Sequence, residues 1–142
     1  MPAVTSAWSA WLQHDRAREA QQDIRDARLF EHRREAYARF VAESNGLASR
    51  YNRHFMDDEA LDLGADPLRS VIDRAALVQL YGTAEAAELA DFAWSALAKY
   101  IRHGREEGGL VFDFQVVLDR FINQARADLG VPETPSVTTE AG

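Results

Sequence analysis

The chain contains no cysteine, few prolines and glycines, and no long hydrophobic run. The lack of cysteine excludes disulfide frameworks, zinc–thiolate sites, iron–sulfur clusters and thiol catalysis. No window approaches the roughly 18 to 20 consecutive apolar residues that a membrane-spanning helix needs. Four prolines and eight glycines in 142 residues leave long uninterrupted segments, and such segments favour helices.

The composition is typical of one globular domain, because 46% of the residues are hydrophobic and 27% are charged. The formal net charge of -7 repels nucleic-acid phosphates, which basic surfaces normally neutralise. We therefore expect no nucleic-acid partner. The first 12 residues carry no basic residue ahead of their short apolar patch, so they do not resemble a signal peptide. We expect the protein in the cytoplasm.

Apolar residues recur every three or four positions in four segments, which predicts four helices and no strand. The expected helices cover about residues 6–56, 67–82, 84–104 and 110–130. Asp66 is expected to cap the second helix, with Pro67 as its first residue and Gly82 as a left-handed cap at its end. Thr83 is expected to cap the third helix. The sequence therefore predicts an all-α antiparallel four-helix bundle with an extended first helix.

The first predicted helix is much longer than the other three. At 1.5 Å per residue its length is roughly 75 Å, whereas the others are roughly 25 to 30 Å long. A strong apolar stripe lies in its second half, at Phe30, Tyr37, Phe40, Val41, Leu47, Ala48, Tyr51 and Phe55. We therefore divide the chain into a charged helical arm (1–28), a four-helix bundle (29–130) and a disordered tail (131–142).

The arm has no evident partner within its own bundle, and isolated helices are only marginally stable in water. Aromatic residues at helical spacing are frequent interface anchors. We therefore predict that Trp8, Trp11, Leu12 and Ile24 contact a protein partner or a second copy of the chain. The alternatives are that the arm docks onto its own bundle, remains free, or lies on a membrane surface.

The sequence offers no convincing set of catalytic or cofactor-binding residues, so we expect no enzyme activity, no cofactor and no metal. No histidine follows a glutamate by three positions, which excludes the paired motif of di-iron bundles. Neither the Glu31, His32 and Glu35 cluster nor the acidic turn at 57–66 has the ligand spacing of a known metal site. Aromatic residues near Trp94 are the one candidate for a small-molecule pocket between helices.

Three segments resemble a recurrent type of uncharacterised helical protein from GC-rich bacteria. They are Glu31–Phe40, with Arg-x-x-x-Tyr-x-x-Phe, Leu77–Gly82, with Leu-x-x-Leu-x-Gly, and Phe121–Gly130, with Phe-x-x-x-Ala-Arg-x-x-Leu-Gly. Fifteen of the 16 basic residues are arginine, which agrees with a GC-rich genome. The resemblance implies a helical bundle over residues 29–130 and no particular activity.

These observations together favour a non-enzymatic interaction or assembly module that binds a partner, or itself, through the N-terminal arm. The competing hypothesis is a regulatory helical domain that binds a small ligand. The first predicts an exposed apolar face on the arm, and the second predicts a cavity between helices near Trp94.

Overall fold

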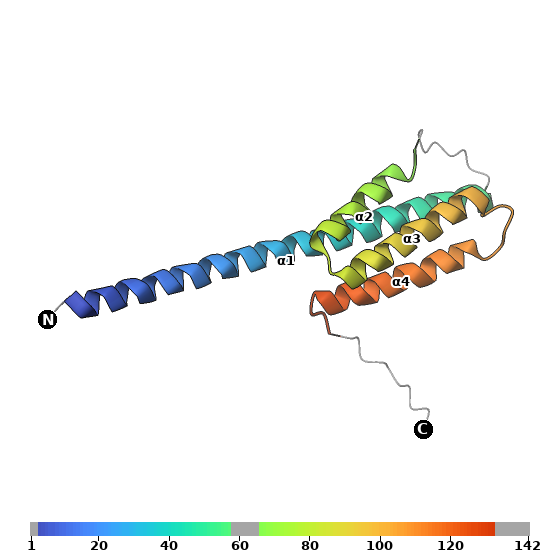
Figure 1. Cartoon of the computed structure of the whole chain (residues 1–142). Coiled ribbons are helices and arrows are strands. Elements are labelled where there is room, and N and C mark those ends of the chain that lie inside the picture. The colour runs from blue at the N-terminus through green and yellow to red at the C-terminus, as the bar shows by residue number, and fades with distance from the viewer. Residues whose placement is uncertain (1–2, 58–65, 133–142) are drawn as a thin grey trace, which may run out of the picture.

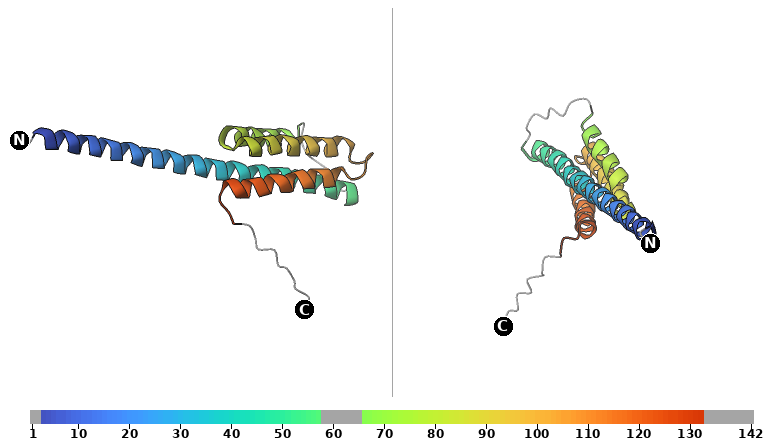
Figure 2. Two further views of the ribbon diagram at one scale, coloured as in Figure 1. Left: turned by 60° about the horizontal axis from the view of Figure 1, so that its bottom comes forward. Right: turned by 90° about the vertical axis from the view of Figure 1, so that its left-hand side faces the viewer.

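The computed structural model describes residues 3–57 and 66–132, and it is an all-α antiparallel four-helix bundle whose first helix extends far beyond the other three (Figure 1). The helices are α1 (Ala3–Asp57), α2 (Arg69–Tyr81), α3 (Ala84–His103) and α4 (Leu110–Asp128). In the left view of Figure 2, α2 and α3 form one layer of the bundle, and α1 and α4 form the other. The fold class predicted from the sequence is confirmed.

Helix α1 is continuous over 55 residues and passes through Gly46 without a break. The Asn45-Gly46 pair was the one candidate for a kink, but the helix continues because neighbouring turns are fixed by packing. Phe40, Leu47 and Ala48 on either side of it are buried in the core. No helix within the described ranges is both long enough and apolar enough to cross a membrane.

The core lies between the four helices and is formed by the apolar faces that the sequence spacing predicted. Its largest buried side chains are Tyr37, Phe40, Phe114, Phe121, Leu47 and Leu97. The ring of Phe121 packs edge-on against Phe40, with centroids 4.9 Å apart, and against Tyr37 at 5.5 Å. Edge-to-face pairs of this kind add to the stabilisation from burial. Helix α4 is thereby held against α1.

The ends of the helices agree with the sequence predictions at some positions and not at others. Thr83 caps α3, since its hydroxyl accepts a hydrogen bond from the Ala86 N–H at 3.2 Å. Gly130 follows α4 with a φ of 68°, as expected for a glycine at a helix end. Gly82 is not left-handed, because its φ is -83° and its ψ is 176°. A side chain there would lie 2.9 Å from the ring of Tyr37, so lack of space is what favours glycine.

The predicted cap at Asp66-Pro67 is wrong by two to three residues. Helix α2 begins at Arg69, and its cap position is Leu68, whose side chain makes no capping hydrogen bond. The backbone oxygen of Asp66 accepts from the Arg69 N–H at 3.3 Å, which closes a turn before the helix. A proline suits the second position of such a turn as well as the first turn of a helix.

Two sequence predictions fall largely or wholly outside the described residues. The acidic turn at 57–66 is described only at its two ends, and the predicted disordered tail is described only at Val131 and Pro132. The Pro132 oxygen accepts a hydrogen bond from Arg126 at 3.1 Å. These two residues therefore still contact the end of α4.

We predict that Ser44→Ala raises the free energy of unfolding by about 1–2 kcal/mol. Ser44 is fully buried in α1, and its hydroxyl has no hydrogen-bond partner. An unsatisfied buried hydroxyl costs about 1–3 kcal/mol, and alanine also has the higher helix propensity. Urea denaturation of the variant and of Ser49→Ala, which is exposed on the same helix, measures the gain. Equal effects of the two substitutions would contradict the prediction.

Candidate functional site

The arm of α1, residues 7–31, projects from the bundle and is exposed along its length (Figures 1 and 2). Every side chain in this range is exposed except that of Leu12, which is half-buried. At 1.5 Å per residue the arm extends about 37 Å. It does not fold back, so docking onto its own bundle, one of the alternatives that the sequence left open, is wrong.

The two tryptophans of the arm contact each other and remain largely open to solvent. Trp8 is 64% exposed and Trp11 is 58% exposed. Their ring centroids lie 5.5 Å apart with planes tilted by 30°, and Leu12 lies in the adjacent turn. Large exposed aromatic side chains that gather on one helix typically belong to a binding surface.

The four residues predicted to bind a partner do not share one face of the arm. A helix has 3.6 residues per turn, so residues 18 positions apart point in the same direction. This spacing relates Trp11 to Leu29 and Leu12 to Phe30. Ile24 is 13 positions from Trp11, which turns it by roughly 140° away from that face. Ile24 therefore belongs to the opposite side of the arm.

Leu29 and Phe30 are exposed apolar residues that the sequence analysis did not assign to the arm surface. They are 45% and 41% exposed. The prediction that Phe30 lies in the core stripe is wrong, because α2 and α4 end before they reach it and no other described helix covers this turn. The signal in the sequence is the spacing of 18 residues from Leu12.

The bundle begins to cover α1 at His32 and Arg33, where the turn between α2 and α3 meets it. The imidazole of His32 stacks on the ring of Tyr81, with centroids 4.9 Å apart. The Arg33 Nε donates a hydrogen bond to the Tyr81 backbone oxygen at 2.8 Å. These contacts fix the direction in which the arm leaves the bundle.

One turn further along α1, Tyr37 links three helices through its hydroxyl. The hydroxyl donates to the Asp128 Oδ2 at 2.6 Å and accepts from the Thr83 N–H at 3.1 Å. The Thr83 hydroxyl donates to the same carboxylate oxygen at 2.7 Å, and Gln124 donates to the other oxygen at 2.8 Å. Burial, and secondly the hydrogen bond to Asp128, raise the pKa of Tyr37 above its ordinary value of 10.0.

We predict that the protein loses stability as the pH rises above about 10. Burial raises the pKa of Tyr51 and Tyr100 as well as that of Tyr37. Between the ordinary value and the raised folded value, the folded chain holds protons that the unfolded chain has released, so the free energy of unfolding falls as pH rises. Urea midpoints measured from pH 8 to pH 11.5 test this. The fall should be shallower in Tyr100→Phe, and a flat profile would contradict the prediction.

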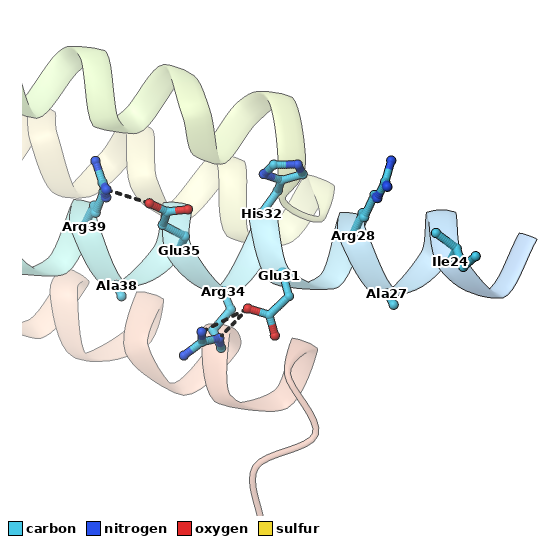
Figure 3. A pocket seen from close by; sticks show the side chains of 9 residues that line it. All are labelled: Ile24, Ala27, Arg28, Glu31, His32, Arg34, Glu35, Ala38 and Arg39. Carbon is cyan, nitrogen blue, oxygen red and sulfur yellow. Dashed lines mark hydrogen bonds and ion pairs between the residues drawn. The ribbon is translucent and has the colours of Figure 1, made fainter. Parts of the chain in front are cut away.

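The largest hollow among the described residues lies on the side of α1 that faces away from the bundle core (Figure 3). It has a volume of about 760 Å³, and it is lined by Ile24, Ala27, Arg28, Glu31, His32, Arg34, Glu35, Ala38 and Arg39. Ion pairs within α1 border it, Glu31 with Arg34 at 2.9 Å and Glu35 with Arg39. Because all nine residues belong to one helix, this is an open groove along α1 and not a ligand cavity between helices.

The hollow next to Trp94 is also formed by a single helix. It has a volume of about 290 Å³ and is lined only by residues of α3: Trp94, Ser95, Ala98, Lys99, Arg102 and His103. The indole N–H of Trp94 donates to the Asp91 carboxylate at 3.2 Å, so it is not directed at a ligand. The cavity between helices that the small-ligand hypothesis needs is therefore not found at this position.

No group of three or more candidate metal ligands gathers in the parts of the chain that the structure describes. The Glu31, His32 and Glu35 cluster remains on the exposed face of α1, where its glutamates pair with arginines. The absence of a cofactor and of enzyme activity stays a prediction.

The arm surface and the bundle can also be compared with known proteins. No protein-family model, curated protein or solved structure matches the chain. The resemblance to helical proteins of GC-rich bacteria therefore stays a prediction, and the argument about function depends on the arm itself.

Proposed function

We propose that this protein is a non-enzymatic helical interaction or assembly module whose arm, residues 7–31, binds another protein chain. The observation that supports this most directly is a helix of about seven turns that no other described helix covers and that exposes both Trp8 and Trp11. The bundle serves as the base from which the arm projects.

The energetics of the arm favour a partner over a free helix. Isolated helices are marginal in water even with good helix formers. Exposed ion pairs add only about 0.2–0.5 kcal/mol each to such a helix. Tryptophans buried at an interface, by contrast, often account for 2 kcal/mol or more each. A partner that covers Trp8 and Trp11 would therefore stabilise the arm more than its own side-chain pairs do.

Trp8, Trp11 and Leu12 are the proposed centre of the binding surface, and Ile24 is a proposed contact on the opposite side of the arm. The local order of the helix up to His32 makes this surface a rigid one, which lowers the entropic cost of binding. A charged, helical surface with a few aromatic anchors is typical of protein partners rather than of small ligands.

Site-specific photo-cross-linking in the cells that produce the protein tests this function. We expect a photoreactive phenylalanine analogue at position 11 of the full chain to form a covalent adduct with another protein chain. The same analogue at position 112, where Phe112 is exposed on α4, should form none. Failure to form an adduct at positions 8, 11 and 12 would show that the arm has no protein partner and would refute the proposal.

A further inference from the structure

The exposed apolar side chains on the tryptophan side of the arm lie in two groups, one near each end. Trp8, Trp11 and Leu12 lie near the free tip, and Leu29 and Phe30 lie next to the bundle. Five helical turns relate the two groups, so they point in the same direction. We call the side of α1 that carries these five residues the arm face.

The stretch between the two apolar groups is polar on the same side. Asp15, Arg18, Glu19, Gln22 and Asp26 are all exposed there, and each lies within roughly one quarter turn of the direction of Trp8. An apolar partner surface would leave these charges without compensation. The partner must therefore present apolar groups at both ends and complementary charges in between.

We propose that the occupant of the arm face is the arm of a second copy of this chain, packed antiparallel to the first. This inference rests on the proposed function of the arm and names its partner. In an antiparallel pair, the tip of each arm lies beside the bundle end of the other, so Trp8 of one copy packs against Leu29 and Phe30 of the second. The two apolar groups thus cover each other twice.

The charges of the arm favour this pairing. In the register that places Trp8 beside Leu29, Arg18 of one copy lies beside Glu19 of the other, and the two-fold axis produces this pair twice. Asp15 lies beside Gln22 in the same register. A parallel pair in register would place Asp15 beside Asp15, and Asp26 beside Asp26, and such like-charge contacts oppose association.

The position of the bundle agrees with this register. The turn between α2 and α3 contacts α1 at His32 and Arg33 on the side of the arm face. The second arm therefore has the face free as far as Phe30. In this register Ala7, the first residue whose side chain is described, lies beside Phe30. The two bundles then lie at opposite ends of a shared helical pair.

Sedimentation equilibrium of the full chain tests the pairing. We expect a concentration-dependent dimer, and we expect Trp8→Ala with Trp11→Ala to raise its dissociation constant by at least about 100-fold, since each tryptophan contacts the other copy twice. The matched control is Ile24→Ala on the opposite side of the arm, which should change the constant by less than about threefold. A stronger effect of Ile24→Ala than of the tryptophan substitutions would overturn the assignment to the arm face.

Cysteine cross-linking determines the direction of the pair, because the chain has no cysteine of its own. We expect oxidation of a mixture of Asp15→Cys and Gln22→Cys chains to yield a mixed disulfide dimer, and neither variant alone to yield a dimer. Disulfide dimers of Asp15→Cys alone would indicate a parallel pair and overturn the antiparallel arrangement.

The failure of this inference is distinguishable from the failure of the proposed function. A monomeric mass at every concentration up to the millimolar range refutes the second copy as occupant. If position 11 still forms photo-cross-linked adducts in cells, and their mass corresponds to a different protein, the arm keeps its interaction function with another partner. If position 11 forms no adduct and the chain is monomeric, both proposals are refuted.

Discussion

Replacing Phe121 with alanine is expected to lower the free energy of unfolding by about 3–5 kcal/mol. The side chain is fully buried, and its ring packs against Phe40 and Tyr37 of α1. Its removal leaves a cavity where α4 meets α1, and the surrounding rings can refill it only in part. Since small domains are stable by about 5–15 kcal/mol, the loss is a large part of the total.

Thermal and urea unfolding followed by circular dichroism measure this effect. The control is Phe112→Ala, which removes an exposed phenylalanine from the same helix and should change the free energy of unfolding by no more than about 0.5 kcal/mol. If the two substitutions had similar effects, α4 would not be packed against α1 as described.

Replacing Tyr37 with phenylalanine is expected to lower the free energy of unfolding by about 1–3 kcal/mol, although the ring and its packing remain. The change removes a donor from the Asp128 carboxylate and an acceptor from the Thr83 N–H. Both partners are only partly exposed, so water replaces the lost bonds incompletely.

The matched control for this prediction is Tyr81→Phe. Tyr81 is half-buried and stacks on His32, and the substitution keeps that ring contact. Its effect should stay within about 0.5 kcal/mol. Hydrogen exchange should also show faster exchange of the first amides of α3 in Tyr37→Phe, since Thr83 caps that helix. Unchanged exchange at this end would contradict the linking role of Tyr37.

The helices themselves were predictable from the sequence because each has an apolar stripe with helical spacing and a suitable end signal. Thr83 illustrates this, since a threonine before an alanine-rich segment is a local signal and the structure confirms it as a cap. Phe30 illustrates the limit. Its spacing fits the core stripe, but its burial depends on where α2 and α4 end, and this is a property of the assembled bundle.

The junction between arm and bundle was not predictable by the same reasoning. Tyr37 and Asp128 are 91 positions apart in the chain, and nothing local in the sequence pairs them. The same is true of the contact between Arg33 and Tyr81. The arm, by contrast, was predicted from a simple excess of helical length, and its exposed tryptophans agree with that prediction.

Because α1 is one unbroken helix, the arm has no hinge where it leaves the bundle. Rotation of the arm about its own axis would carry Arg33 and Tyr37 with it and pull them away from Tyr81 and Asp128. The helix therefore acts as a stiff spacer with a set compass bearing. A load placed at its tip is transmitted as torque to the start of α3 and is not absorbed by swivelling.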